Sequence, residues 1–181
     1  MSFNAPFNLS RWIEKNRALL RPPVANRLVF DEPGGLIIQV IGGGNRRVDF
    51  HDDPAQEFFY QLSGDMILKI RDRGKSEDVL IREGDVFLLP PHVPHSPQRP
   101  VAGSIGLVVE GPRSPGAKDG FEWYCFQCES RVHRVEITVN NIVEDLPPLF
   151  DAFYGDTSKR RCPGCGALHP GREPPPGWAE L

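Results

Sequence analysis

At 181 residues, the chain is long enough to bury one core of ordinary size, so we expect one main domain with at most a small appendage. Its 21 basic and 24 acidic residues leave a formal net charge of −3, which argues against the global positive field of a nucleic-acid-binding protein. Because the chain contains no run of eighteen apolar residues and no signal-peptide pattern, we expect a soluble, cytoplasmic protein with small-molecule partners and no nucleic-acid or membrane partner.

A short helix is predicted near the start of the chain, between Asn8 and Leu20. Apolar residues recur there at roughly helical spacing: Leu9, Trp12, Ile13, Leu19 and Leu20. Asn8 or Ser10 can cap its first turn, and Pro22 and Pro23 follow its end. Because no chemically reactive group repeats along this helix, we expect it to cover a sheet edge or to form a subunit contact.

From Arg27 to about Val109 the sequence changes to short runs rich in branched aliphatic and aromatic residues, separated by turn signals such as Gly-Gly-Gly-Asn and Ser-Gly-Asp. Roughly eight short strands with no helical pattern between them predict a β-barrel of the jelly-roll type. Within it, 66–82 is typical of a solvent-facing hairpin, and 86–89 of a buried strand. We therefore predict a barrel with its N-terminal helix over residues 1–115, and an extension packed on the barrel over residues 116–181.

Charged side chains interrupt the apolar pattern around one turn of the predicted barrel. Strand alternation places Arg47, Asp49 and His51 on one face of a strand. The sequence Asp-Asp-Pro then breaks that strand, and Glu57 opens the next one, which is otherwise aromatic. A carboxylate at that position is costly to bury unless it is paired or bound to a cation, so we predict that Glu57 returns across the turn to lie beside His51 as a metal ligand.

A second histidine follows in a stretch stiffened by prolines at 90, 91, 94, 97 and 100. In extended geometry His95 and Arg99 project on the same side of this stretch. Two imidazoles and one carboxylate can hold a divalent iron and leave one side of it open to substrate and oxygen. His51, Glu57 and His95 are therefore the predicted ligands of a catalytic metal in a metal-dependent dioxygenase.

Each candidate ligand also has a plainer interpretation. A single histidine in a β protein is more often a hydrogen-bonded or surface group than a metal ligand, and only the joint pattern favours ligation. His92 lies three residues before His95 and is interpreted as a group outside the ligand set. His133 and His169 have no partner pattern and are assigned no function.

The last third of the chain carries all four cysteines, as two close pairs: Cys125, Cys128, Cys162 and Cys165. In a reducing compartment such pairs favour a tetrahedral iron or zinc site over disulfides. We predict a structural role, because metal affinity is coupled to folding in such sites. A strand over 131–139 and a helix over 145–154 are predicted between the pairs, with Pro147 and Pro148 near the first turn of that helix. Trp178 is predicted to anchor a proline-rich, extended tail.

Two motifs resemble those of the cupin barrels. The second cupin motif is matched by Gly84-x5-Pro90-x-His92-x2-His95, with His92 at a usual glycine and Arg99 at a frequent asparagine. The first is matched by His51-x5-Glu57-x6-Gly64, with Asp49 in place of the usual first histidine. Together with Arg47, Arg99, Glu110 and the cysteine pairs, of which the second resembles rubredoxin, this variant resembles the bacterial type of 3-hydroxyanthranilate 3,4-dioxygenase, over nearly the whole chain.

The resemblance implies a cupin-type double-stranded β-helix with a rubredoxin-like four-cysteine region and a catalytic Fe(II) bound by His51, Glu57 and His95. It also implies cleavage of 3-hydroxyanthranilate by O2 to 2-amino-3-carboxymuconate semialdehyde, a step of tryptophan catabolism. A homodimer is expected. Arg47 would serve the oxygen and substrate side, Arg99 would bind the substrate carboxylate, and Glu110 would contact the substrate amine or hydroxyl and accept a proton. Glu57 would lie at the substrate site as well as on the metal.

Three alternatives stay open on the residues alone. Another cupin enzyme, such as a phosphosugar isomerase, would usually carry more histidines and a phosphate-binding cation. A thiol dioxygenase of this fold prefers three histidines, so Glu57 weighs against it. A non-catalytic cupin that binds a small ligand would lack the pair Arg47 and Arg99.

Overall fold

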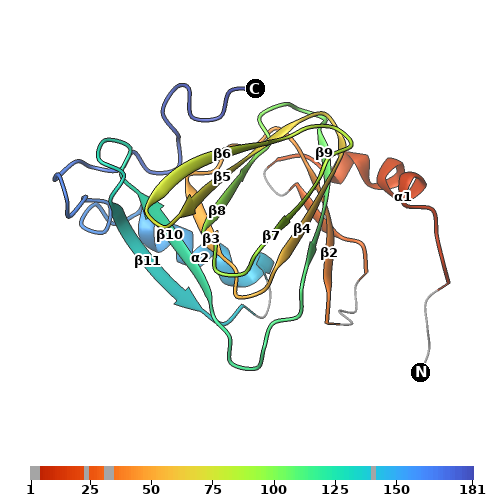
Figure 1. Ribbon diagram of the computed structural model, residues 1–181, viewed down its shortest axis with the longest axis horizontal. Coiled ribbons are helices and arrows are strands. Elements are labelled where there is room, and N and C mark those ends of the chain that lie inside the picture. The colour runs from red at the N-terminus through yellow and green to blue at the C-terminus, as the bar shows by residue number, and fades with distance from the viewer. Residues whose placement is uncertain (1–4, 23–24, 31–34, 140–141) are drawn as a thin grey trace.

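The computed structural model describes residues 5–22, 25–30, 35–139 and 142–181, and in these residues two antiparallel sheets face each other (Figure 1). The five-stranded sheet has the order β1 (Asn26–Leu28), β2 (Ile37–Gly42), β9 (Ile105–Glu110), β4 (Glu57–Ser63) and β7 (Val86–Leu89). The six-stranded sheet has the order β11 (Arg131–Ile137), β10 (Asp119–Tyr124), β3 (Asp49–Asp52), β8 (His95–Gln98), β5 (Met66–Asp72) and β6 (Lys75–Ile81). The predicted double-stranded barrel and its β5–β6 hairpin are confirmed, but the hairpin faces solvent only along β6, because Met66 to Ile70 of β5 are buried.

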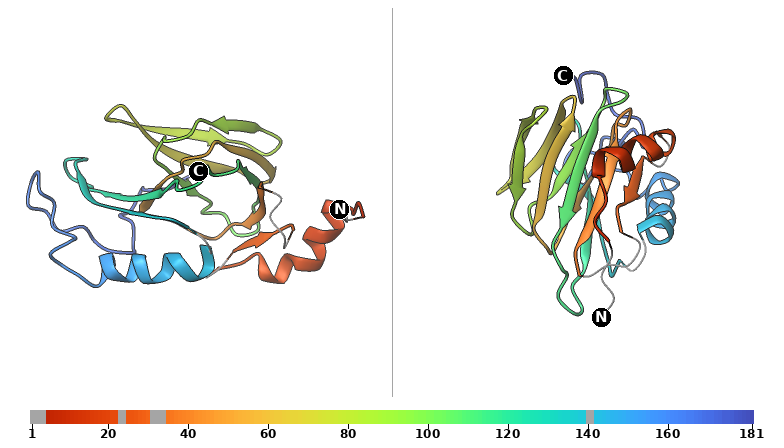
Figure 2. Two further views of the ribbon diagram at one scale, coloured as in Figure 1. Left: turned by 90° about the horizontal axis from the view of Figure 1, so that it is seen from below. Right: turned by 90° about the vertical axis from the view of Figure 1, so that its right-hand side faces the viewer.

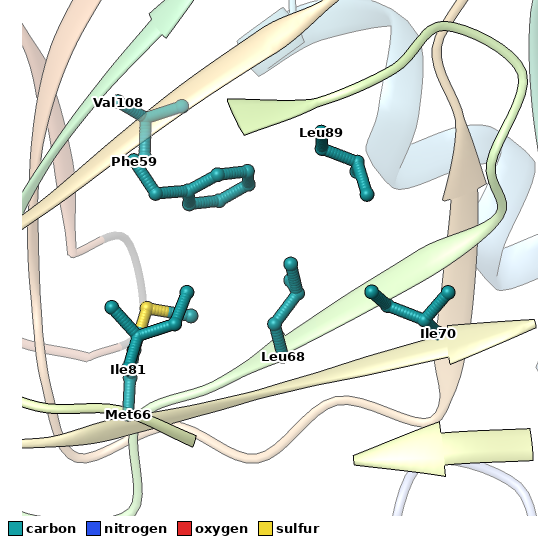
Figure 3. Close-up of a cluster of buried hydrophobic side chains, with 7 residues drawn as sticks. All are labelled: Phe59, Met66, Leu68, Ile70, Ile81, Leu89 and Val108. Carbon is teal, nitrogen blue, oxygen red and sulfur yellow. The ribbon is translucent and has the colours of Figure 1, made fainter. Parts of the chain in front are cut away.

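The core lies between the two sheets and is filled by side chains from both of them. Figure 3 shows it as a cluster that faces inward from several strands: Phe59, Met66, Leu68, Ile70, Ile81, Leu89 and Val108. Met66 and Leu68 are completely buried. Because alternate residues of a strand point to the same face, these positions follow from the period-two pattern of β4, β5 and β9. This apolar cluster fills part of the barrel, which leaves the space near β3 for polar groups.

The N-terminal helix α1 (Leu9–Asn16) continues into a 3-10 turn, η1 (Arg17–Leu19). Asn8 caps it, because its side-chain oxygen accepts a hydrogen bond of 2.9 Å from the backbone N–H of Arg11. The helix packs its apolar face, including Ile13, on Val40 of β2 and Ile105 of β9. The predicted helix and its Asn8 cap are confirmed, whereas the expected place over a sheet edge is not, because β2 and β9 are inner strands of their sheet. Pro23 lies outside the described residues.

Helix α2 (Ile142–Tyr154) lies across the sheet formed by β10 and β11 (Figure 2). Phe150 and Phe153 pack against Trp123, and the rings of Trp123 and Phe153 stack with their centroids 4.2 Å apart. The helix begins before the predicted 145, so Pro147 and Pro148 fall inside it rather than in its first turn. Neither described helix is long and apolar enough to cross a membrane.

Two strands, β7 and β10, differ from what the sequence predicted. β7 is a strand, but the prediction that it is buried is wrong: it lies at the edge of its sheet, with Val86 and Leu88 exposed. β10 was not predicted, and it pairs with β3 on one side and β11 on the other. The extension therefore shares a sheet with the barrel, and the boundary at residue 115 stays a prediction.

The C-terminal tail returns to the barrel, where Trp178 holds it. The indole Nε1–H of Trp178 donates a hydrogen bond of 2.7 Å to the backbone oxygen of Arg47. Its ring lies edge-on to Phe126 and Phe50, with centroids 4.9 and 6.3 Å away, and Lys69 Nζ lies 4.2 Å from it. The predicted anchoring role of Trp178 is confirmed.

Candidate metal centre and active site

Two adjacent strands of one sheet and one strand of the facing sheet bring the three predicted ligands together. His51 on β3 and His95 on β8 are directly paired in register. Glu57 opens β4 in the opposite sheet, and its Oε1 lies 2.9 Å from His95 Nε2 and 3.6 Å from His51 Nδ1. The ligand atoms of all three residues lie within 4.8 Å of one another. The structure therefore brings His51, Glu57 and His95 together as a possible metal site.

Hydrogen bonds on the far side of each ring assign the tautomers of the two histidines. His95 Nδ1 lies 3.0 Å from the carbonyl oxygen of Val93, to which only an N–H can donate. His51 Nε2 lies 2.8 Å from Asp119 Oδ1, which requires the proton on Nε2. The unprotonated nitrogens, His95 Nε2 and His51 Nδ1, then face Glu57 and are free to bind a metal.

The burial and hydrogen bonding of these three side chains fit a bound cation. Glu57 is 4% exposed, and its Oε1 has no hydrogen-bond partner among the described residues. A buried carboxylate oxygen facing two imidazole nitrogens is costly unless a positive ion compensates it. His51 also stacks on Phe121 at a centroid distance of 5.0 Å, which fixes the plane of its ring.

A cavity of about 460 Å³, large enough for a single aromatic ring, opens beside His51, whereas Glu57 and His95 are not among its lining residues. Its polar wall includes Gln39, Arg47, Asp49, His51, Glu110, Arg113 and Asp119. Its apolar wall includes Ile41, Phe121, Val139, Leu146, Phe150 and Tyr154. Burial, the largest cause, raises the pKa of Tyr154 to about 12, so its phenol stays protonated at neutral pH.

Arg47 and Glu110 both reach this cavity. The guanidinium of Arg47 is held by Asp49, with Nε 3.2 Å from Oδ2, and its side chain keeps 34% exposure. Glu110 on β9 is the cross-strand neighbour of Glu57, and it accepts hydrogen bonds of 2.7 Å from Gln39 and 2.9 Å from Arg113. Burial raises the pKa of Glu110 to about 7, the charge of Glu57 adds to this, and Arg113 opposes it.

Arg99 is placed differently from Arg47, since it is not among the residues that line the cavity. It is 1% exposed, its Nη1 donates to Gln61 Oε1, and its Nε has no hydrogen-bond partner in the part of the chain that the structure describes. Gly106 on β9 makes room for it, because a Cβ there would fall 2.6 Å from Arg99 Cζ. Burial without a carboxylate partner lowers the pKa of Arg99 to about 10.

Comparison with known proteins identifies the family. The chain matches the sequence model of the family described as 3-hydroxyanthranilic acid dioxygenase over residues 1–154. The chain belongs to this family. A "3-hydroxyanthranilate 3,4-dioxygenase" of Shewanella woodyi is 58% identical to it, over 100% of this chain and 95% of the relative. One of Ruegeria pomeroyi is 57% identical, over 97% of each chain.

Among solved structures, a cupin-2 domain protein of Shewanella frigidimarina aligns with a TM-score of 0.41 and 14% identity, over 56% of this chain and 92% of that one. Membership in the 3-hydroxyanthranilic acid dioxygenase family rests on the sequence matches. It does not favour the alternatives of an isomerase, a thiol dioxygenase or a non-catalytic cupin.

This member of the family also brings its four cysteines together. The Sγ atoms of Cys125 and Cys165 lie 3.6 Å apart, and those of Cys128 and Cys162 lie 3.5 Å apart. These separations are too long for disulfides and are near the roughly 3.7 Å edge of four sulfurs bound about 2.3 Å from one ion. The predicted four-cysteine cluster is confirmed.

Two charged residues of the site were missed from the sequence. Arg113 lies in a Pro-Arg-Ser-Pro-Gly loop, which is typical of a solvated turn, and Asp119 opens the strand that was not predicted. The spacing from Glu110 to Arg113 was the available signal, since only two residues separate them. His92, by contrast, lies outside the ligand set as predicted: its side chain is 66% exposed and its Nδ1 lies 3.1 Å from Asp52 Oδ1.

Proposed function

We propose that this chain is a ring-cleaving dioxygenase that converts 3-hydroxyanthranilate and O2 to 2-amino-3-carboxymuconate semialdehyde. The observation that carries the proposal is the convergence of His51, Glu57 and His95 beside a cavity of about 460 Å³, in a chain of this family. Both oxygen atoms enter the product, so the reaction consumes no external reductant. The absence of a nicotinamide or flavin fingerprint from the sequence agrees with this stoichiometry.

Ferrous iron is the metal we propose for His51, Glu57 and His95. Two neutral imidazoles and one carboxylate on one side of the ion are the ligand set of non-haem Fe(II) oxygenases. When bound, iron supplies the electronic coupling that lets O2 react with an electron-rich aromatic ring. The protein contributes the fixed ligand geometry, through the hydrogen bonds of His51 to Asp119 and of His95 to Val93.

Charged groups near the ligands suit the substrate's own substituents. Glu110, hydrogen-bonded to Gln39 and Arg113, would contact the amine or hydroxyl and accept its proton. Its pKa near 7 matches such a role at neutral pH. Arg47, held by Asp49 at the cavity wall, would orient the substrate on the oxygen side.

We assign the substrate carboxylate to Arg99. Burying a guanidinium without an anion is costly, and a carboxylate bound in a bidentate way would offset that cost. Arg99 has only Gln61 as its side-chain partner within the described residues. Because Arg99 does not line the cavity, the substrate carboxylate would pass the cavity wall to reach it. The carboxylate would then replace Gln61 as the acceptor of the Arg99 hydrogen bond.

The four cysteines would hold iron or zinc in a structural role. Backbone bonds shape both cysteine pairs in the same way: Glu129 N–H donates to Cys125 O, and Gly166 N–H donates to Cys162 O. We further propose a cytoplasmic homodimer, in which exposed apolar side chains near strand β1, such as Phe7, Leu28 and Phe30, would be covered by the second copy.

Oxygen uptake by the Fe(II)-loaded protein offered 3-hydroxyanthranilate tests the proposed function. One O2 should be consumed per substrate, and activity should fall to background when a ferrous chelator is added. His95→Asn should abolish uptake, because it removes a ligand. The same substitution three residues earlier, His92→Asn, should leave uptake unchanged, because the His92 side chain is exposed. Asparagine also tolerates the positive φ of 61° at this position. No uptake by the wild-type protein would overturn the proposal.

A further inference from the structure

A single guanidinium joins three buried carboxylates next to the metal ligands. Nη2 of Arg113 lies 2.9 Å from Asp53 Oδ2, 2.9 Å from Glu110 Oε2 and 2.7 Å from Asp119 Oδ1. Its Nε adds a contact of 3.0 Å to Asp119 Oδ2. Asp53, Glu110 and Asp119 are 2%, 4% and 0% exposed. We call Arg113 and these three carboxylates the carboxylate clamp.

Each carboxylate of the clamp lies beside a metal ligand or faces the cavity. Asp119 opens β10 and accepts the Nε2–H of His51 at 2.8 Å. Glu110 closes β9 and faces the cavity. Asp53 lies in the turn between His51 and Glu57, where its Oδ1 accepts a hydrogen bond of 2.7 Å from the N–H of Ala55. The clamp therefore connects the ends of three strands that meet around the metal ligands.

The charges of the clamp decide which cation occupies it. His51, Asp53 and Asp119 lie close enough together to hold an ion of their own. Arg113, however, already contacts Asp53 and Asp119, so a metal bound by these two carboxylates would lie next to a positively charged guanidinium. Without Arg113, three carboxylates and Glu57 would share one buried region with no fixed positive charge. A cation that bonds all three is therefore required for their burial.

We propose that Arg113 and Asp119 are positioning residues for the metal centre and for Glu110. Asp119 fixes the Nε2–H tautomer of His51, so that Nδ1 faces Glu57 and the metal, and Arg113 holds Asp119 and Glu110 in one arrangement. Metal ligation and the orientation of the substrate-facing carboxylate are thereby set by the same guanidinium. The inference deepens the proposed function and rests on it for the role of Glu110, but its part on the metal does not require the substrate.

The chain offers a matched control for a clamp that is only structural. Arg134 on β11 also holds three carboxylates: it contacts Glu122, and its Nη2 lies 2.8 Å from both Asp52 and Glu136. Among the described residues, the ion pairs of Arg134 are with Asp52, Glu122 and Glu136, not with the metal ligands or Glu110, and Arg134 does not line the cavity. Loss of this second network should lower stability without altering metal binding.

Titration with Mn(II), followed by the EPR signal of the free ion, tests the metal part of the proposal. Mn(II) prefers nitrogen and oxygen ligands to thiolates, so it reports on the His51 site of protein purified with its cysteine site loaded. Asp119→Asn should weaken Mn(II) binding by about 10- to 100-fold, the usual effect of losing such a partner of a ligating histidine. Arg113→Lys should weaken it by a smaller factor, because a lysine cannot contact all the carboxylates at once. Arg134→Lys should bind Mn(II) as the wild type does.

Steady-state kinetics and thermal unfolding of the same variants complete the test. With saturating metal, Arg113→Lys should lower kcat more than Arg134→Lys does, at an equal folded fraction, because Glu110 is no longer held. Wild-type Mn(II) affinity in both Asp119→Asn and Arg113→Lys, with lowered melting temperatures as in Arg134→Lys, would overturn the proposal. An absence of turnover in the wild type would instead reject the proposed function, and the Mn(II) comparison would still decide the positioning role.

Discussion

Arg99 is the most unusual residue of the site, because it buries a full positive charge without a carboxylate partner among the described residues. Such a group is costly in the free protein, and an arriving anion would offset that cost. The specificity of the site for a carboxylate-bearing ring would then come from an arginine that the free protein leaves uncompensated. Arg47, already paired with Asp49, has less to gain from an added anion.

Arg99→Ala should raise the KM for 3-hydroxyanthranilate by an amount worth ~2 to 4 kcal/mol, the loss of a charge-assisted pair of hydrogen bonds. Steady-state oxygen uptake measures it. An unchanged KM would remove Arg99 from the substrate site.

A second variant checks the same prediction without altering the arginine. Gly106→Ala would place a Cβ 2.6 Å from Arg99 Cζ, so it should displace the guanidinium and raise KM in the same direction. Gly111→Ala is the control, because the nearest atom to its Cβ would be Gln56 O at 3.4 Å, which is not a clash. Equal KM values in the two glycine variants would count against the role of Arg99.

The metal ligands could be predicted because residue type and spacing carry them. His51 and Glu57 flank a turn, and His95 follows a proline-rich stretch, so local geometry brings each of them to the barrel interior. Asp119 and Arg113 could not be predicted in this way. Their roles depend on the pairing of β10 with β3, which places Asp119 against a histidine 68 residues earlier in the chain.

At the scale of the elements, the strands of the barrel were predictable from alternation and turn signals, whereas the edges were not. Val86 to Leu89 has the composition of a buried strand, yet within the described residues β7 has a neighbouring strand on one side only, and two of its four side chains face solvent. β10 contains Glu122 and Asp119, which obscure its pattern, and both are buried only because arginines from other segments pair with them. Tertiary pairing thus overrides the local signal in both strands.

The segment that follows the second cysteine pair contains a buried neutral histidine that should make the protein acid-sensitive. His169 is 2% exposed, and burial, with the charge of Arg160, lowers its pKa to about 4. The unfolded chain has a histidine pKa of about 6.5 and binds the proton first, so stability is retained above pH ~6.5 and is lost as the pH falls toward ~4. The loss from this group is about 3 kcal/mol at most.

Urea unfolding between pH 7 and pH 4.5 measures this effect. His169→Asn keeps an acceptor for the Gly171 N–H but does not titrate, so its free energy of unfolding should fall less steeply with acid than that of the wild type. Parallel slopes for wild type and His169→Asn would contradict the assignment.

For the molecule as a whole, the two proposed metal sites should stabilise different parts of the fold. The first would join the two sheets, because Glu57 lies in one and both histidines lie in the other. An ion that binds only the folded protein stabilises it by ~2.7 kcal/mol at a concentration of one hundred times its Kd. The second would join the loop after β10 to the loop after α2.

Cys125→Ser and Cys162→Ser should therefore lower stability more than turnover. Each removes a thiolate from a site whose metal affinity is coupled to folding, so the melting temperature should fall while kcat per folded molecule stays near that of the wild type. Differential scanning calorimetry and oxygen uptake on the same samples make the comparison. A proportionate loss of kcat in fully folded protein would show that the cysteine site takes part in turnover.

Anomalous diffraction at the iron absorption edge, from crystals grown with Fe(II) and soaked anaerobically with 3-hydroxyanthranilate, is the most direct test of the central claim. We predict an iron peak about 2.1 Å from His51 Nδ1, His95 Nε2 and a Glu57 oxygen, the usual range for metal bonds to nitrogen and oxygen. The substrate ring should lie in the cavity with its carboxylate on Arg99. An iron peak only at the four cysteines, or at His51, Asp53 and Asp119, would contradict the account.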